Sequence, residues 1–338
     1  MRLYRPGPLG GLDSQLLYHA LARVGREGLV LCRPDGPYVS IGYHQDLAQE
    51  IDLAHCRRRG LPVFRREVAG GAVYLDRGQL FYQLVVRRGN PRWPARRERL
   101  FARLLGPVVA TLRELGLPAR LVPPCDIHVG GRKISGNGAG EIGDCAVLVG
   151  NLLVEFDCAA MSRVLRLPGE GARRVVRREM ERALTTLRRE LPRAPSLEAL
   201  EERLAGAFAR AVPGLEAGEV PPEVWAKARE IEPEYRAPQW LYEPGRTLPY
   251  RELKIAEGTC VYAFGEEGAG AAPLLLVVRK GRIRWVGTAG GEAGVRWRSF
   301  LGRRLLVERL RRVPWDELGT GAQPGWEDPG RLLSAVTR

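Results

Sequence analysis

Two clusters of residues in this sequence combine cationic side chains with small ones in a way that suits acyl or phosphoryl chemistry. The first runs from Arg65 to Asp76 through a small-residue turn, and the second places Lys133 before a glycine-rich segment. A turn without bulky side chains lets backbone N–H groups approach an oxyanion, and arginine forks bind phosphate or carboxylate groups. A lysine ammonium in such a place can stabilise the charge that develops during acyl transfer. Taken separately, each cluster is also typical of an ordinary hairpin or of a surface lysine.

Lysine is rare in this chain, which draws attention to Lys133. The sequence contains 49 arginines and four lysines, so arginine is its usual cation. A lysine that remains in such a chain either reflects drift or marks a site that needs a compact ammonium on a flexible stem. Lys133 is therefore the candidate catalytic residue.

The six cysteines and four histidines predict neither a disulfide scaffold nor a metal site. They lie far apart, with no Cys-x-x-Cys pair and no histidine spaced for zinc. A nucleophilic cysteine would need partial exposure and a lowered pKa, which a nearby lysine can provide. Cys145, twelve residues after Lys133, is the first candidate for this role, and Cys125 is the second. Because Cys145 borders the apolar residues 146–148, a buried structural thiol is the favoured interpretation.

Hydrophobic periodicity predicts strands and turns around both clusters. Gly130-Gly131 is typical of a hairpin turn, so Lys133 is expected at a strand end that runs into a mobile glycine-rich loop. The predicted helices cover residues 13–25, 95–115, 161–165 and 196–212, and the predicted strands cover residues 28–32, 38–42, 62–65, 71–75, 80–86 and 146–156.

The second half of the chain contains a connector and a smaller unit. Proline and glycine residues between positions 213 and 249 are typical of a connector, and three apolar runs after it predict strands over residues 259–264, 274–278 and 283–286. We place the boundary near Gly245, which predicts a first domain of residues 1–245 and a second of residues 246–338.

Composition and charge describe a basic globular chain. Of its 338 residues, 45% are hydrophobic and 27% charged, with a formal net charge of +14, so collagen-like and disordered classes are excluded. No apolar run reaches the ~18–20 residues that span a bilayer, and the N-terminus lacks the apolar part of a signal peptide. We therefore expect a cytoplasmic protein without membrane contact.

The positive charge favours an acidic partner. A nucleic-acid-binding protein would interleave aromatic residues with its arginines for base stacking, but the arginine-dense residues 173–189 contain no aromatic side chain. Nucleic-acid binding is therefore the remote alternative, and no nucleic-acid partner is expected. Those arginines are more typical of a solvated helix face.

Three segments taken together resemble the lipoate–protein ligase family of the biotin/lipoate ligase superfamily. They are residues 38–45 (YVSIGYHQ), Arg65 to Asp76, and residues 131–136 (GRKISG), in the order and separation of that family. The resemblance covers roughly residues 12–167, and residues 254–287 resemble the accessory domain of two-domain ligases. It implies an α/β (α+β) fold: a biotin/lipoate ligase-like catalytic domain with mixed β-sheets flanked by helices, followed by a small α+β C-terminal accessory domain.

The resemblance also implies an activity. Such enzymes activate lipoate with ATP to lipoyl-AMP and transfer the lipoyl group to a lysine of a lipoyl domain of a 2-oxoacid dehydrogenase E2 subunit or of glycine-cleavage H protein. Mg²⁺ would accompany ATP, and Lys133 would face the acyl carbonyl and the α-phosphate. The implied substrate- and nucleotide-binding residues are Arg65, Arg66, Ala69, Gly70, Gly71, Ala72, Val73, Tyr74, Asp76, Ser135, Gly136 and Asn137.

The sequence departs from the family pattern at several positions. Ala69 stands where the family has the third glycine of the turn, Val68 replaces a small hydroxyl residue, and Leu75 replaces a histidine. Residues 137–143 differ from the common Ser-Ala-Gln continuation. These departures put the contacts to the adenylate, the substrate and the acceptor in question.

The same superfamily contains cysteine-dependent octanoyl transferases, which take the acyl group from acyl carrier protein without ATP. In that alternative Cys145 would be the nucleophile. The extra C-terminal unit favours the ligase, since transferases of this type usually lack it. Biotin ligase is disfavoured because its Gly-Arg-Gly-Arg signature is absent.

Overall fold

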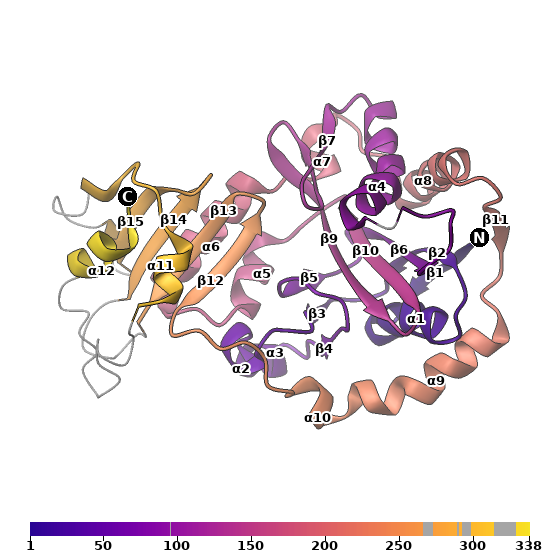
Figure 1. The fold of residues 1–338 in the computed structure, drawn as a ribbon, viewed down its shortest axis with the longest axis horizontal. Coiled ribbons are helices and arrows are strands. Elements are labelled where there is room, and N and C mark those ends of the chain that lie inside the picture. The colour runs from indigo at the N-terminus through magenta and orange to yellow at the C-terminus, as the bar shows by residue number, and fades with distance from the viewer. Residues whose placement is uncertain (95, 266–272, 289–290, 293–298, 314–328) are drawn as a thin grey trace. The chain divides into compact units, whose positions relative to one another are not determined.

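The computed structural model of the protein describes residues 1–94, 96–265, 273–288, 291–292, 299–313 and 329–338 (Figure 1). The chain divides into two compact units. Unit 1 contains residues 1–164 and 184–246, and unit 2 contains residues 165–183 and 247–338. The change at residue 246 lies beside the predicted boundary at Gly245, but residues 165–183, which the prediction assigned to the first domain, pack in unit 2. None of the described helices is long and apolar enough to cross a membrane.

Unit 1 is built on an eight-stranded mixed sheet. β1 is parallel to both of its neighbours, and the other pairs are antiparallel. In spatial order the strands are β11 (Glu216–Gly218), β1 (Arg2–Leu9), β2 (Gly28–Pro34), β6 (Gln79–Arg87), β10 (Cys145–Leu153), β9 (Arg132–Ile142), β8 (Asp126–Val129) and β7 (Ala119–Val122).

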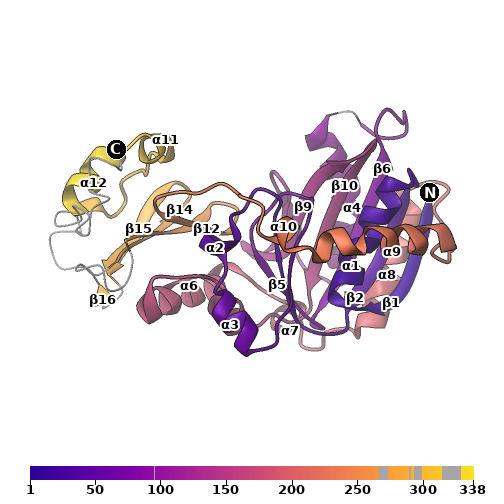
Figure 2. The same cartoon turned by 90° about the horizontal axis from the view of Figure 1, so that it is seen from below.

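Helices cover both faces of this sheet, and each has its own apolar core. Because side chains alternate along a strand, Leu29 and Leu31 of β2 join the core with α4 (Arg97–Glu114) and α8 (Leu197–Ala211). Val30 and Cys32 join the core with α1 (Gly11–Arg23) and α9 (Pro222–Arg236), which lie side by side (Figure 2). The central strands are therefore buried on both faces, which explains their nearly continuous apolar sequences.

A second, three-stranded sheet of unit 1 carries the first cluster. Its order is β4 (Val63–Arg65), β3 (Tyr38–Ile41) and β5 (Val73–Leu75). The short helices α2 (Leu47–Glu50) and α3 (Leu53–Arg58) begin at Asp46 and Asp52, whose carboxylates accept backbone N–H groups as N-caps. The remaining helices of unit 1 are α5 (Cys158–Val164), α7 (Leu187–Glu190) and α10 (Pro238–Leu241).

Two predictions about unit 1 were wrong. Residues 132–142 form the long strand β9 rather than a mobile loop, because Gly138 and Gly140 allow the chain at residues 67–69 to approach the strand. A Cβ atom added to Gly138 would lie 2.5 Å from the Ala69 carbonyl oxygen. The predicted connector contains the fifteen-residue helix α9, whose residues Val224, Ala228 and Ile231 have helical spacing and are buried.

Unit 2 contains an antiparallel five-stranded sheet in sequence order: β12 (Arg251–Ala256), β13 (Thr259–Phe264), β14 (Leu274–Arg279), β15 (Arg282–Thr288) and β16 (Gly291–Glu292). The three predicted strands of this region are confirmed. α6 (Gly169–Ala183) packs against β12 and β13, while α11 (Val307–Arg311) and α12 (Pro329–Val336) join the apolar core of the unit.

α6 explains why residues 165–183 belong to unit 2. Its apolar positions Val175, Val176 and Met180 are buried, and its buried Glu179 accepts hydrogen bonds from Arg279 at 3.2 and 2.5 Å. Arg174, Arg177 and Arg182 are exposed on the other side of the helix. The arginine-dense segment therefore has the amphipathic structure that its sequence indicates.

Candidate functional site

Lys133 and Asp126 form an ion pair at one end of the large sheet. The distance between Lys133 Nζ and Asp126 Oδ1 is 3.0 Å, and the side chains are 20% and 6% exposed. The backbone N–H of Thr185 donates to the Lys133 carbonyl oxygen at 2.8 Å, which holds the main chain beneath the side chain. An ammonium has three donors, so the bond to Asp126 fixes its position while further donors can reach a carbonyl or phosphate oxygen.

A β-bulge places Lys133 on this side of the sheet. Ile127 of β8 pairs with Ser135 of β9, whereas the next residue, His128, pairs with Lys133, so Ile134 is the extra residue of β9. Ile127 and Ile134 are both fully buried in the core shared with α4 and α8. Bulges redirect side chains beside active sites, and this bulge directs Lys133 to the face opposite that core.

A chain of hydrogen bonds connects the two clusters. The N–H of Gly136 donates to Asn151 Oδ1 at 3.1 Å, and Asn151 Nδ2 donates to Gln79 Oε1 at 2.6 Å. Gln79 Nε2 donates to Asp76 Oδ1 at 3.4 Å and to the Tyr74 carbonyl oxygen at 3.2 Å. Burial raises the pKa of Asp76, although the bonds from the Gly78 N–H and Gln79 oppose this effect.

Sequence reasoning missed Gln79 and Asn151. Each is a polar residue in a strand whose neighbours are apolar, and this contrast was the available signal. Gly136 also has a steric role, since a Cβ there would lie 3.1 Å from Lys133 Cε and 3.3 Å from its Nζ. Glycine therefore leaves space directly beside the lysine ammonium.

Ser135 and Asn137 face inward to the protein. Tyr82 Oη lies 2.6 Å from Ser135 Oγ and donates to Asn137 Oδ1 at 2.6 Å, while Asn137 Nδ2 donates to the Cys125 carbonyl oxygen at 2.6 Å. Burial raises the pKa of Tyr82, which keeps its hydroxyl protonated. These bonds hold the turn before Asp126 against β9. The nucleotide contact that the resemblance implies for Ser135 and Asn137 stays a prediction.

Arg66 lies beneath the small-residue turn. Its guanidinium donates to the Gly71 carbonyl oxygen at 2.8 Å and to the Ser40 carbonyl oxygen at 3.1 Å. Burial lowers its pKa, but an arginine remains charged. The turn is pressed closely on Gly42, where a Cβ would lie 2.0 Å from the Gly70 carbonyl oxygen. Ala72, Val73 and Tyr74 continue from this turn into β5.

Arg65 has a different environment from the one implied by the resemblance. The residue is 1% exposed, and its N–H groups donate to carbonyl oxygens of two segments, residues 42–45 and residues 240–243. The closest is Tyr43 O at 2.7 Å. In return, Trp240 Nε1 donates to the Arg65 carbonyl oxygen at 3.0 Å. Arg65 therefore clamps these segments together, and the substrate or nucleotide contact that the resemblance implies for it stays a prediction.

The departures at positions 68 and 75 have a packing explanation. Val68 is 0% and Leu75 6% exposed, and both belong to the apolar core with α1 and α9. Ala69 donates its N–H to the Ala139 carbonyl oxygen at 3.1 Å, which attaches the turn to β9. The turn is thus held by apolar packing and by a backbone bond where the family uses more polar residues.

The two candidate nucleophiles lie at different positions along β9, Cys145 beside its end at Ile142 and Cys125 beside Asn137 in its middle. Cys145 is fully buried, and burial raises the pKa of its thiol. It pairs with Ile142, nine residues along β9 from Lys133, which is about 30 Å at strand rise. Its burial and its distance from Lys133 therefore argue against Cys145 as a nucleophile at the Lys133 site. Cys125 precedes Asp126, is partly exposed, and donates its thiol to the Asn137 carbonyl oxygen at 3.4 Å.

The described residues contain no group of three histidine, cysteine or carboxylate side chains that could hold a metal ion. His19 is a structural histidine: Nδ1 lies 2.7 Å from the Gln15 carbonyl oxygen, and Nε2 accepts the Glu67 N–H at 3.3 Å. Burial lowers the pKa of His19 to about 3, so the ring is neutral. It anchors the start of the first cluster to α1.

Comparison with known proteins identifies relatives of this arrangement. Residues 11–209 match the family model of the lipoyl protein ligase A/B catalytic domain. The octanoyltransferase LipM of Kyrpidia tusciae is 31% identical over 231 residues, which cover 62% of this chain and 84% of that protein. The lipoate-protein ligase LplJ of Bacillus subtilis is 36% identical over 101 residues, covering 30% of this chain and 29% of the relative.

Solved structures share the fold. A bipartite lipoate protein ligase from Thermoplasma acidophilum, described with its E2 lipoyl domain, has a TM-score of 0.65 at 24% identity and covers 73% of this chain and 98% of that one. A lipoate-protein ligase A bound with ATP has a TM-score of 0.60 at 24% identity, covering 71% and 98%. At this identity the structures establish the fold, and they confirm the predicted α/β class with mixed sheets flanked by helices.

Proposed function

Since the chain belongs to the lipoyl protein ligase A/B family, an enzyme family of lipoyl and octanoyl transfer, we propose that it is an ATP-dependent lipoate–protein ligase. Its substrates are lipoate and ATP, and its acceptors are lysines of lipoyl domains of 2-oxoacid dehydrogenase E2 subunits or of glycine-cleavage H protein. The observation that carries the proposal is the Lys133–Asp126 ion pair beside Gly136.

The proposed reaction has two steps. A lipoate carboxylate oxygen attacks the α-phosphorus of ATP, which forms the acyl–phosphate bond of lipoyl-AMP and releases pyrophosphate. The amine of the acceptor lysine then attacks the acyl carbon, the bond to AMP breaks, and the amine loses a proton. Negative charge gathers at the α-phosphate in the first step and at the acyl oxygen and departing AMP in the second. The ammonium of Lys133 stabilises this charge in both.

The neighbouring residues prepare Lys133 for that role. Asp126 holds the ammonium in place before substrate binds, so little reorganisation is needed during the reaction. Gly136 leaves space for an acyl or phosphate oxygen next to Nζ. Mg²⁺ is proposed as the ion that enters with ATP, since it commonly binds through substrate phosphates and one or two carboxylates.

Two observations favour the ligase over a cysteine-dependent transferase. Cys145, the first candidate nucleophile, is buried and distant from Lys133. The chain also contains unit 2, whereas the match to the LipM octanoyltransferase of Kyrpidia tusciae covers 62% of this chain.

An octanoyl transferase that uses Cys125 is the second candidate. The Cys125 thiolate would attack the thioester carbon of an acylated carrier protein, form a new thioester and release the carrier thiol, before the acceptor lysine takes the acyl group. The observation in its favour is the position of Cys125, partly exposed and adjacent to Asp126. The identity to the LipM octanoyltransferases points in the same direction.

Intact mass spectrometry of an apo lipoyl domain tests both candidates. One mixture contains lipoate, ATP and Mg²⁺, and the other contains octanoyl carrier protein without ATP. A mass gain in the first mixture, retained by Cys125→Ala, is expected for the ligase. A gain in the second mixture that Cys125→Ala abolishes and Cys145→Ala retains would establish the transferase, and no gain in either would overturn both.

A further inference from the structure

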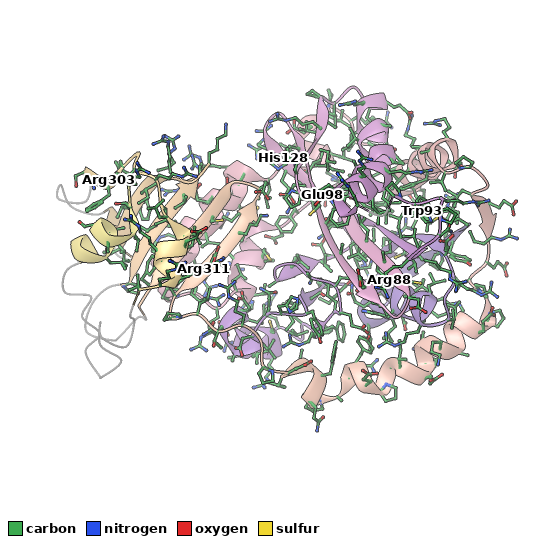
Figure 3. All side chains as sticks on the ribbon, in the orientation of Figure 1. Arg88, Trp93, Glu98, His128, Arg303 and Arg311 are labelled. Atoms are coloured by element: carbon green, nitrogen blue, oxygen red, sulfur yellow. The ribbon has the colours of Figure 1, made fainter. Side chains whose placement is uncertain are left out.

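His128, which Figure 3 labels, is a buried histidine on β8. Its ring lies next to the Lys133–Asp126 pair. It is 5% exposed, and its Nε2 atom has no hydrogen-bond partner among the residues that the structure describes. Nε2 lies 3.7 Å from Asp126 Oδ2. The Lys133 ammonium lies 3.0 Å from the other carboxylate oxygen, Oδ1. The proposed reaction, as derived above, gives this side chain no role.

The strand register brings the three side chains together. Asp126 and His128 are two residues apart on β8, so they share one face of the sheet. His128 is also the residue that pairs with Lys133 across the bulge. One carboxylate therefore stands between an ammonium and an imidazole, with one oxygen toward each.

We propose that His128 is a positioning residue that controls, through Asp126, how firmly the Lys133 ammonium is held. The inference rests on the role proposed for Lys133. While the ring is neutral, Asp126 directs its charge to Lys133. When the ring gains a proton, Nε2–H donates to Oδ2, the 3.7 Å gap closes, and the carboxylate moves away from Lys133. Because an imidazole ring can bind and release a proton, the arrangement is a protonation-dependent control of the catalytic ammonium.

Other charged groups surround the ring without replacing Asp126. Arg120 of β7 pairs with His128 across the strand but is exposed. Arg132 of β9 pairs with Glu190 at 2.6 Å. Lys133 and Asp126 are therefore the groups whose charges the ring is expected to sense most strongly, because exposed charges are screened by solvent.

Carbon-13 NMR of histidine-labelled protein tests the coupling without any substrate. The chain has four histidines, and His19 serves as an internal fold marker because its buried ring should not titrate above about pH 4. Lys133→Met removes a positive charge and one partner of the Asp126 carboxylate, so His128 should bind its proton about tenfold more tightly. In a chain that also carries Asp126→Asn the effect of Lys133→Met should disappear. Lys133→Gln is a second variant that removes the same positive charge as Lys133→Met.

Equal proton affinity of His128 in wild type, Lys133→Met and Lys133→Gln would overturn the inference. Coupling by NMR in a protein that modifies no lipoyl domain would instead overturn the proposed function alone. An activity measurement completes the test. Pyrophosphate exchange with lipoate and ATP needs no acceptor lysine, so its loss below neutral pH should report the state of the site. His128→Asn keeps a donor toward Asp126 but does not titrate, and it should flatten this acid limb and lower kcat more than it raises KM.

Discussion

Arg65 and Lys133 are both cations of the motifs that resemble the ligase family, yet their surroundings differ completely. Arg65 is 1% exposed and its guanidinium donates to carbonyl oxygens of two chain segments. Lys133 is 20% exposed and pairs with the carboxylate of Asp126 at 3.0 Å. A cation whose donors already bind backbone carbonyls stabilises the fold, whereas a cation held by one carboxylate beside open space can act on a substrate. The comparison teaches that a motif can combine a scaffold residue with a chemical one.

The largest effect is expected for Arg65→Ala. Removal of the guanidinium leaves several buried carbonyl oxygens without donors, which should lower the free energy of unfolding by about 3–5 kcal/mol. Urea denaturation measures this change. Arg57→Ala is the matched control, because Arg57 is exposed and donates to Tyr242 Oη at 3.2 Å. Equal stability of Arg65→Ala and Arg57→Ala would contradict the clamp.

Lys133→Ala should affect the rate of lipoyl transfer more than the stability of the fold. The rate of lipoyl transfer should fall about 10²–10³-fold, because a preorganised charge near the reacting oxygen is lost, while the urea midpoint should fall less than in Arg65→Ala. Lys227→Ala is the control, since that partly exposed lysine pairs with Glu230 on the same helix. Rates are read from the mass of the acceptor domain. A transfer rate in Lys133→Ala that matches the Lys227→Ala rate would remove Lys133 from the chemistry.

Gly138→Ala tests how closely the backbone of the small-residue turn packs against β9. The new Cβ would lie 2.5 Å from the Ala69 carbonyl oxygen, so the small-residue turn or β9 must move, at a cost of about 1–3 kcal/mol in stability. Gly106→Ala on α4 has open space and should be neutral or slightly stabilising, since alanine favours helices. If both variants melt at the wild-type temperature, the close contact between the turn and β9 is not required.

His19, which supports the fold, should make the free energy of unfolding depend on pH. Its folded-state pKa is lowered to about 3 from an ordinary value of 6.5. The unfolded chain therefore binds the proton more tightly, and the stabilising contribution of neutral His19 is complete above pH 6.5 and decreases as the pH falls toward 3. The slope is about 1.4 kcal/mol per pH unit at most.

Urea unfolding between pH 4.5 and 7.5 checks this sign. His19→Gln should lose the slope, and the exposed His44 in His44→Gln should keep it. A slope that is identical in His19→Gln and wild type would assign the acid sensitivity to other groups.

Much of the fold could be predicted because it follows from local patterns. Alternating and continuous apolar runs gave the strands at residues 28–32 and 80–86, and helical spacing gave α1 and α8. The helix α9 was missed although Val224, Ala228 and Ile231 carry its periodicity, because the prolines around it suggested a connector. The insertion of α6 into unit 2 could not be predicted, since packing between segments far apart in the chain decides it.

The sequence by itself determined the chemistry available at the candidate site: a lone lysine among arginines, a small-residue turn, and the spacing that places both in one family. The tertiary structure alone decided which residues act and which support them. Asp126, Gln79 and Asn151 reach the site from three different strands, and three of the carbonyl groups that Arg65 binds lie more than 170 positions away in the chain. The physical reason is that residue type sets what a side chain can donate or accept, whereas burial and cross-strand register set what it meets.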